Sequence, residues 1–339
     1  MHLIQYGHLL CEVFMLNIND VSTDKAETRH VKVLILGAGP AGLSAALYSA
    51  RAELEPVVIT GMQIGGQVAI TNTVENYPGF PEGVGGSELG ELFQKQAERF
   101  GARVVIDSAQ SVDLSIRPFK VTTDNGIYTT DSLIIATGAN PNHLNIPREN
   151  ELAGRGVSYC GTCDGWFFKG KKVAVVGGGD SALEEGLFLT RFATRVTIIH
   201  RRDSLRAGAL LQKRVVENPN MQFIWNTAVT SIVGSEKVEA LQLQNIKDGG
   251  QSTFETDGLF IFIGHTPNTQ MFTGQVEMGN GYIKVNERFQ TSVPGVYAAG
   301  EAADPHFKQV ITSAGMGAAA AIEATHFLEQ ESNQGNSPG

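Results

Sequence analysis

Residues 31–42 read VKVLILGAGPAG, and this stretch decides the fold. Its first half is apolar and β-branched, as is typical of a strand buried in a parallel sheet. Its second half has GxGxxG spacing, and an apolar helical period follows from Leu43 to Ala50. A strand, a glycine turn and a helix in this order bind a dinucleotide, because backbone N–H groups can approach its pyrophosphate at the helix N-terminus. We therefore expect nucleotide contacts at Gly37, Gly39, Pro40, Ala41 and Gly42.

A second copy of this unit lies at residues 172–182, which read KVAVVGGGDSA. Its turn has the accepted variant GxGxxA, and a helix and the strand at 195–199 follow it. Two such units predict an α/β protein with two Rossmann-like nucleotide-binding domains. The alternative is that both glycine turns only permit tight packing. For the second nucleotide we expect contacts at Gly177, Gly179, Asp180 and Ser181.

The residues that end the second strand of each unit indicate which nucleotide is held. The first unit has Thr60 there, so its fingerprint alone does not distinguish FAD from NAD. The second unit reads HRRD at 200–203, with Arg206 one helical turn further. An acid at this place would favour a free ribose 2′-hydroxyl, whereas adjacent guanidinium groups suit a 2′-phosphate. We predict an NADPH site that uses His200, Arg201, Arg202 and Arg206; a solvated basic turn is the alternative.

Cys160 and Cys163 form a CxxC motif in a chain of 339 residues with three cysteines. In a large, cysteine-poor chain this spacing indicates redox or metal chemistry. Zinc needs four ligands, and no second CxxC or histidine pair supplies the rest, so no metal site is expected. Asp164 follows directly and can act as a general acid or base for the thiols, or can serve as a turn residue before Gly165. Cys11 is expected to be a bystander.

Two further strand ends suggest ligand contacts. The strand at 133–136 runs into Thr137-Gly138, and the strand at 295–299 ends at Gly300-Glu301. An acid at the carboxyl end of a strand can accept a hydrogen bond from a ribitol hydroxyl. A helix of small residues from about Ser313 to Ala324 could approach a ligand closely, or could simply pack tightly on the sheet.

The composition narrows the class of protein. The length suggests two domains, and a net charge of −9 without basic runs argues against nucleic-acid binding. No apolar run reaches the length of a membrane span. Residues 1–30 are expected to be an N-terminal extension, either flexible or translated from a start codon upstream of the true start at Met15. Residues 331–339 are expected to be a polar tail.

From about residue 31 to 328 the chain resembles the low-molecular-weight, NADPH-dependent thioredoxin reductases. The motifs occur in the family's order, at Gly37–Gly42, Gly65–Gln67, Val74–Gly79, Ala136–Ala139, Cys160–Gly165, Gly177–Ala182, His200–Asp203 and Ala299–Glu301. The chain departs from the family at Gly161, Glu301 and Lys308, where alanine, aspartate and arginine are usual.

The resemblance implies a cytoplasmic, homodimeric flavoprotein that uses NADPH to reduce the disulfide of thioredoxin or of a thioredoxin-like protein. It implies FAD in the first nucleotide site, in a discontinuous FAD domain at 31–141 and 268–330. An NADPH domain at 142–267, which carries the redox-active cysteines, is inserted into it. The implied cofactor contacts further include Gly66, Gln67, Asn76, Thr137, Gly138, Gly300, Glu301, Lys308 and Gln309.

NADPH delivers two electrons and a disulfide accepts two, so a flavin is a suitable carrier between them. The cysteine pair and the NADPH site lie in one segment and both need the flavin. We therefore hypothesise that this segment rotates on linkers near 139–147 and 264–270.

Other classes of protein with similar motifs fit the sequence less well. A peroxide-reducing relative needs an added thioredoxin-like domain, and a ferredoxin-dependent one needs no arginine pair. A flavin oxidoreductase acting on quinones needs no CxxC, and a nucleotide sensor would tolerate loss of either cysteine.

Overall fold

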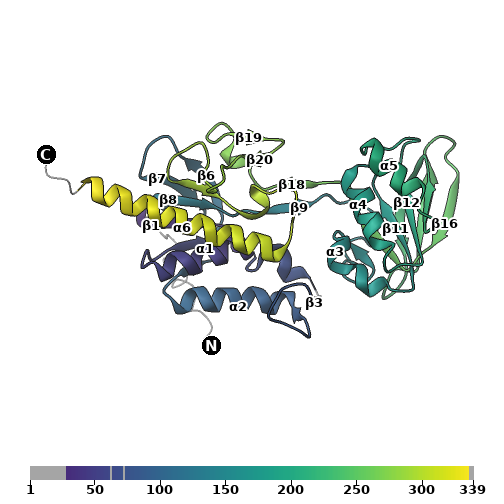
Figure 1. The fold of residues 1–339 in the computed structure, drawn as a ribbon, viewed down its shortest axis with the longest axis horizontal. Coiled ribbons are helices and arrows are strands. Elements are labelled where there is room, and N and C mark those ends of the chain that lie inside the picture. Colours follow the sequence, from purple (N-terminus) through teal and green to yellow (C-terminus); the bar gives the residue numbers. More distant parts are fainter. Residues whose placement is uncertain (1–27, 62, 72, 336–339) are drawn as a thin grey trace, which may run out of the picture.

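The computed structural model describes residues 28–61, 63–71 and 73–335. Met15, Cys11 and the rest of the expected extension up to residue 27 lie outside these ranges. The described chain forms two lobes, each with a sheet and helices packed on it (Figure 1). The chain crosses between the lobes through β9 (Ala139–Pro141) and β18 (His265–Pro267), which pair antiparallel.

The first lobe contains a seven-stranded sheet with the strand order β5-β2-β1-β8-β7-β6 and with β21 on the other side of β8. The strands are β1 (Thr28–Leu36), β2 (Val57–Ile59), β5 (Arg103–Val105), β6 (Ala109–Asp113), β7 (Phe119–Thr123), β8 (Gly126–Ile135) and β21 (Val296–Ala298). This sheet is mixed, because β6, β7 and β8 pair antiparallel. Its helices are α1 (Pro40–Arg51), α2 (Gly86–Arg99) and α6 (Val310–Gly335). Two short pairs complete it: β3 (Thr73–Val74) with β4 (Val84–Gly85), and β19 (Met278–Gly279) with β20 (Tyr282–Ile283).

The second lobe contains a five-stranded parallel sheet with the order β10-β17-β11-β12-β13. The strands are β10 (Val157–Ser158), β11 (Lys172–Val176), β12 (Arg195–Ile199), β13 (Met221–Ile224) and β17 (Gly258–Ile261). Its helices are α3 (Gly161–Asp164), α4 (Asp180–Leu189) and α5 (Ala209–Val216). A three-stranded antiparallel sheet of β14 (Thr227–Val233), β15 (Ala240–Asn245) and β16 (Gln251–Glu255) packs beside it.

The second lobe is inserted into the first, because β21 and α6 follow it in the chain but belong to the first sheet's lobe. Each lobe carries one of the two glycine motifs, on the β1–α1 connection in the first lobe and the β11–α4 connection in the second. The predicted fold class, two Rossmann-like units with one inserted into the other, is therefore confirmed.

Two element ends differ from the sequence prediction. Strand β1 begins at Thr28, so residues 28–30 are not part of a flexible extension; they pair with residues 127–129 because the ten-residue β8 extends far enough to hold them. Helix α6 continues to Gly335, so residues 331–335 of the expected tail are helical. Glu331 in this last part forms an ion pair with Arg117.

Both cores are built from strands buried on two faces. In β1 and β8 the runs Val33–Ile35 and Leu133–Ile135 are fully buried, and Val173–Val175 in β11 is buried in the second lobe. Such runs lie where both faces of a parallel sheet are covered. No helix within the described ranges is long and apolar enough to cross a membrane.

Candidate active site

The glycines of the first motif are of two kinds: at two of them the neighbouring backbone leaves no room for a side chain, and at the third the space is open. A Cβ at Gly37 would lie 2.2 Å from the carbonyl oxygen of Ala136, and one at Gly42 would lie 1.8 Å from that of Gly37. These two glycines therefore let the turn pack against the end of β8. Among the described atoms outside the immediate backbone, a Cβ at Gly39 would meet only Gly66 Cα, at 4.0 Å. Gly39 is the N-cap of α1, and no side chain of the described residues caps the backbone N–H groups of the first helical turn. The turn therefore fits a pyrophosphate that approaches the helix N-terminus.

The second motif likewise has one glycine with no room for a side chain and one that faces open space. A Cβ at Gly177 would lie 2.5 Å from the carbonyl oxygen of Phe262, so this glycine is needed for packing. Around a Cβ at Gly179 no described atom outside the immediate backbone lies within 4 Å, and Gly179 caps α4 without a side-chain hydrogen bond. Asp180 Oδ1 accepts a hydrogen bond from Gly208 N at 2.8 Å. This bond fixes the start of α4 to the loop that follows the arginines.

The arginines after β12 lie at the surface beside the second glycine turn. Arg201, Arg202 and Arg206 are exposed, and the backbone N–H of Arg206 donates to Gly178 O at 2.7 Å. Asp203 pairs instead with Lys247, with Nζ to Oδ2 at 3.1 Å, so its carboxylate does not neutralise the neighbouring arginines. The loop thus presents three guanidinium groups near the N-terminus of α4.

His200, which we predicted beside these arginines as a cofactor contact, is buried under the turn. A Cβ at Gly178 would lie 2.3 Å from its imidazole ring, and Nε2 has no hydrogen-bond partner within the described part of the chain. Burial lowers the pKa of His200, and the cationic Arg206 and Arg202 lower it further, despite backbone hydrogen bonds that raise it. His200 therefore supports the glycine turn as a neutral ring.

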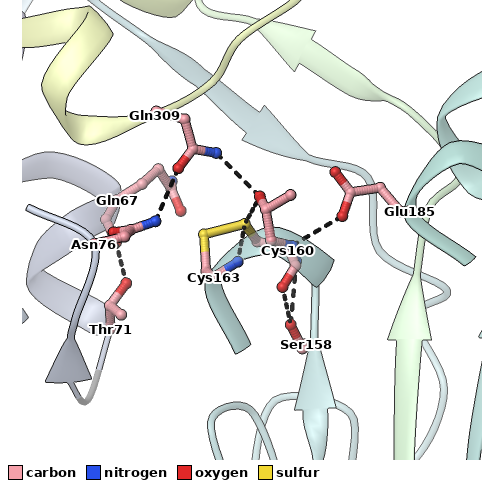
Figure 2. Close-up of a disulfide and its surroundings, with 9 residues drawn as sticks. Gln67, Thr71, Asn76, Ser158, Cys160, Cys163, Glu185 and Gln309 are labelled. Atoms are coloured by element: carbon pink, nitrogen blue, oxygen red, sulfur yellow. Dashed lines mark hydrogen bonds between the residues drawn. A yellow bond between two sulfur atoms is a disulfide. The ribbon is translucent and has the colours of Figure 1, made fainter. Parts of the chain in front are cut away.

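The cysteine pair forms a disulfide at the start of α3 (Figure 2). The Cα atoms of Cys160 and Cys163 are 5.3 Å apart. Cys160 Sγ accepts a hydrogen bond from Cys163 N at 3.2 Å, so the sulfur itself caps this short helix. Ser158, the last residue of β10, receives a hydrogen bond from Cys160 N at Oγ and donates one to Cys160 O, both at 3.1 Å. The end of the strand therefore holds Cys160 in place.

Two carboxyl groups lie close to the disulfide. Burial raises the pKa of Asp164, and its hydrogen bond to Ser158 offsets part of this shift. Burial also raises the pKa of Glu185, while backbone hydrogen bonds from Thr162 and Gly161 oppose the shift. Glu185 Oε2 accepts from Thr162 N at 3.0 Å. The sequence predicted Asp164 but not Glu185, which comes from α4 and reaches the cysteines only because α3 packs beside that helix.

Side chains of the first lobe face the disulfide from the other side (Figure 2). Asn76 Nδ2 donates to Gln309 Oε1 at 3.1 Å, and Gln309 Nε2 donates to Thr162 Oγ1 at 3.2 Å. Gln67 Nε2 donates to Asn140 Oδ1 at 2.8 Å, at the crossing between the lobes. The structure thus brings Gln309 beside Gln67 and Asn76, from which it is far apart in the sequence; all three are predicted flavin contacts.

Thr137 and Gly138, also predicted as cofactor contacts, lie at the junction of the two crossings. Thr137 Oγ1 donates to Asn268 O at 2.7 Å, and Asn268 Nδ2 donates to Thr137 O at 3.1 Å. Asn268 N donates to Gly138 O at 2.9 Å. The Thr137 hydroxyl therefore joins the outgoing and returning chain, a role that no local sequence signal indicated.

A second group of titratable residues surrounds the strand end at Gly300. A Cβ at Gly300 would lie 2.9 Å from Ala41 Cβ, so this residue adjoins the first glycine turn. Burial raises the pKa of Glu301 to about 7, although the cationic Lys308 opposes the shift. Lys308 Nζ lies 3.0 Å from Nδ1 of His265, whose pKa is lowered to about 4 by burial and by this cation. A neutral His265 accepts a hydrogen bond from Lys308, a contact that the sequence did not reveal.

The disulfide, the side chains that face it from the first lobe, and Glu301 with Lys308 and His265 line one cleft of about 1570 Å³ between the lobes. Its lining includes Pro40 of the first glycine turn, Ser181 of the second, the disulfide and Glu301. One cleft therefore adjoins both nucleotide motifs and the cysteine pair, which is the arrangement that electron transfer among them requires.

Comparisons with known proteins agree with this geometry. A family model described as pyridine nucleotide-disulphide oxidoreductase matches residues 31–317. The chain is 50% identical over 305 residues to thioredoxin reductase of Rickettsia felis, which covers 88% of this chain and 98% of the relative. It is 46% identical over 312 residues to that of Escherichia coli O157:H7, with 89% and 97% covered. The chain belongs to the thioredoxin reductase family of pyridine nucleotide-disulphide oxidoreductases.

Membership confirms the resemblance that the sequence motifs indicated. The family uses FAD and NADPH, so both predicted cofactors are confirmed. Two solved structures of similar identity superpose unequally on this chain. Thioredoxin reductase from Streptococcus pyogenes MGAS5005 has 38% identity and a TM-score of 0.85, and covers 90% of this chain and 100% of its own. Lactococcus lactis thioredoxin reductase in the FR conformation has 37% identity but a TM-score of 0.60, with 88% and 99% covered.

Proposed function

We propose that this protein reduces the disulfide of thioredoxin with NADPH, through FAD and the Cys160/Cys163 pair. The observation that carries the proposal is the single cleft that adjoins both nucleotide motifs and the disulfide. NADPH, one proton and the thioredoxin disulfide give NADP⁺ and two thiols, so two electrons and two protons are accounted for. We also propose a cytoplasmic homodimer, which rests on the resemblance to the family.

The nucleotide motifs assign one cofactor to each lobe. FAD, when bound, supplies a two-electron carrier that side chains lack. Gly39 at the start of α1, with Gly66 beside it, would hold its pyrophosphate, and Glu301 would accept a hydrogen bond from its ribitol. The FAD domain comprises 31–141 and 268–330, with residues 28–30 and 331–335 added to its first strand and last helix. The NADPH domain comprises 142–267.

Two guanidinium groups would select NADPH over NADH. Arg201 and Arg202 are exposed, and Asp203 forms its ion pair with Lys247 and not with either arginine. Paired guanidinium groups bind a 2′-phosphate through charge-assisted hydrogen bonds. Arg206 reinforces this positive charge beside the glycine turn.

Asp164 would supply a proton to the cysteine pair. A half-buried carboxyl with a raised pKa keeps its proton to higher pH and can donate it to a thiolate that leaves a disulfide. On the other side, the N–H of Cys163 that caps Cys160 Sγ would stabilise a thiolate on Cys160. The pair shares the exchange chemistry, and neither cysteine is assigned the attack on thioredoxin.

The inserted lobe must rotate relative to the first lobe in each catalytic cycle, so that the disulfide and NADPH can reach the flavin in turn. Its disulfide faces Gln309 and Asn76 of the first lobe, while its NADPH motif lies on another connection of the same sheet. The unequal TM-scores of two structures with nearly equal identity and coverage support two arrangements of the same domains. The crossings β9 and β18 are the only strands that join the lobes within the described ranges, so they are the expected hinge.

A protein substrate would dock beside the cysteine pair. Trp166 and Phe167, in the 3₁₀ helix Gly165–Phe168 that follows α3, are 53% and 43% exposed. Large exposed aromatic side chains are favourable anchors for a protein partner. Because they follow the disulfide directly, a partner bound to them would have its own disulfide within reach when the pair is exposed.

The test is an NADPH-oxidation assay on the purified yellow protein, with thioredoxin and insulin as acceptors. Cys160→Ser, Cys163→Ser and Asp164→Asn are measured beside the wild type. We expect wild-type turnover, no turnover by either serine variant although both retain FAD, and slower reduction of thioredoxin by Asp164→Asn. Failure of NADPH to reduce the flavin would refute the assigned donor, and flavin reduction without thioredoxin reduction would refute the assigned partner.

A further inference from the structure

The hydroxyl group of Thr162 lies where the two lobes meet. It accepts a hydrogen bond from Gln309 Nε2 at 3.2 Å, and Gln309 is itself held by Asn76 at 3.1 Å (Figure 2). Asn76 and Gln309 both belong to the first lobe, whereas Thr162 belongs to α3 of the inserted lobe. The bond from Gln309 to Thr162 therefore crosses between the lobes, and it can form only while α3 is docked against the first lobe.

The inserted lobe holds Thr162 from its other side. The backbone N–H of Thr162 donates to Glu185 Oε2 at 3.0 Å, and Glu185 lies on α4 of the same lobe. Its hydroxyl oxygen is also 3.4 Å from Cys160 Sγ. Helix α3 is thus fixed to α4 and moves with it. When the lobe turns, the bond to Gln309 must break while the bond to Glu185 can remain.

We propose that Gln309 and Thr162 form a latch that holds the cysteine pair docked against the first lobe, and that Thr162 is a positioning residue for electron transfer to the disulfide. The proposal rests on the proposed function. A hydroxyl can accept a hydrogen bond from Gln309 and still donate its own hydrogen to Cys160 Sγ. The latch is therefore compatible with both the oxidised and the reduced pair.

The strength of one neutral hydrogen bond suits a latch that opens in every turnover. Such a bond shifts an equilibrium by about 2- to 10-fold, which biases the docked state without trapping the protein in it. The exposed position of Thr162 means that a substitution there leaves the core of the lobe intact. The latch can therefore be removed by a single isosteric change.

The experiment compares Thr162→Val, which removes the hydroxyl, with Thr162→Ser, which retains it, both as FAD-loaded protein. Stopped-flow absorbance follows flavin reduction by NADPH, and then reoxidation by transfer to the disulfide. In Thr162→Val we expect the first step to accelerate by about 2- to 10-fold, because the undocked state is more populated, and the second step to slow. Thr162→Ser should behave like the wild type in both steps.

Amide hydrogen exchange supplies a readout that is independent of turnover. Faster exchange in residues 305–313 and 160–168 of Thr162→Val, but not of Thr162→Ser, would support the latch. Slowing of both kinetic steps in Thr162→Val would overturn it, since local damage to the pair would be the cause. Unchanged kinetics, or serine behaving like valine, would also overturn it. Failure of NADPH to reduce wild-type flavin would instead refute the proposed function.

Discussion

Gly161 and Glu185 occupy complementary space beside the disulfide. A Cβ at Gly161 would lie 2.4 Å from Glu185 Oε2 and 3.4 Å from Phe262 Cζ. The carboxylate thus lies where the methyl group of an alanine, the residue expected here from the sequence resemblance, would point, and it accepts a hydrogen bond from the backbone N–H of Thr162. The departure at Gly161 is therefore coupled to the position of a half-buried carboxyl group on α4.

This coupling predicts how alanine at position 161 would act. Gly161→Ala should favour the helix by about 0.5–1 kcal/mol. It should also displace the Glu185 carboxylate, so that the free energy of unfolding changes by less than about 1 kcal/mol. In a Glu185→Ala background, Gly161→Ala should raise the free energy of unfolding by the full amount that alanine gains over glycine in a helix, about 0.5–1 kcal/mol. Denaturant unfolding of both singles and the double variant measures this coupling; equal stabilisation in both backgrounds would show that the two residues are independent.

The sequence predicted the parts of the site that are formed by residues adjacent to one another in the chain. Each glycine turn, with its strand and helix, is contiguous, so the turns that contain Gly39 and Gly179 could be located without a structure. Glu185 and His265 could not, because each reaches its partner only through the packing of α3 on α4 or through the return of the chain at β18. The early start of β1 at Thr28 was likewise missed, since it depends on the length of β8 and not on the polar residues themselves.

Glu301 should make FAD binding depend on pH. Burial raises its pKa from the ordinary 4.5 to about 7, so in FAD-free protein it is mostly protonated below pH 7. If the carboxylate accepts a ribitol hydrogen bond, binding must release a proton below that pH. Affinity should then rise with pH up to about 7 and level off above it, with binding about 3- to 10-fold weaker at pH 6 than at pH 8. FAD titrations of the wild type measure this slope, and Glu301→Gln should abolish it; an unchanged slope in that variant would assign the proton to another group.

The arginine pair should determine the choice between NADPH and NADH. Loss of a charge-assisted hydrogen bond costs about 1.5–3 kcal/mol, so Arg201→Ala and Arg202→Ala should each raise the KM for NADPH by about 10- to 100-fold. The KM for NADH, which has no 2′-phosphate, should change little. Arg214→Ala on α5 is the matched control, because this arginine is also exposed but lies outside the loop. Equal losses with both nucleotides would mean that the arginines do not recognise the phosphate.

Gly317 and Gly315 on α6 provide a matched pair for the contact between α6 and the first glycine motif. A Cβ at Gly317 would lie 1.9 Å from the carbonyl oxygen of Ala41, whereas no described atom outside the immediate backbone lies within 4 Å of one at Gly315. Backbone cannot yield as a side chain can, so Gly317→Ala should push α6 away from α1 and destabilise the protein by about 1–3 kcal/mol or more.

Gly315→Ala adds the same methyl group to the same helix in open space. It should stabilise by about 0.5–1 kcal/mol, because alanine loses less conformational entropy in a helix than glycine does. Thermal unfolding of the FAD-loaded variants compares the two changes directly, and release of FAD on heating shows whether the nucleotide site opens with them. Since Ala41 lies in the first turn of α1, we expect Gly317→Ala to release FAD at lower temperature than the wild type. Retention of wild-type FAD release by Gly317→Ala would mean that α6 can shift without disturbing the nucleotide site.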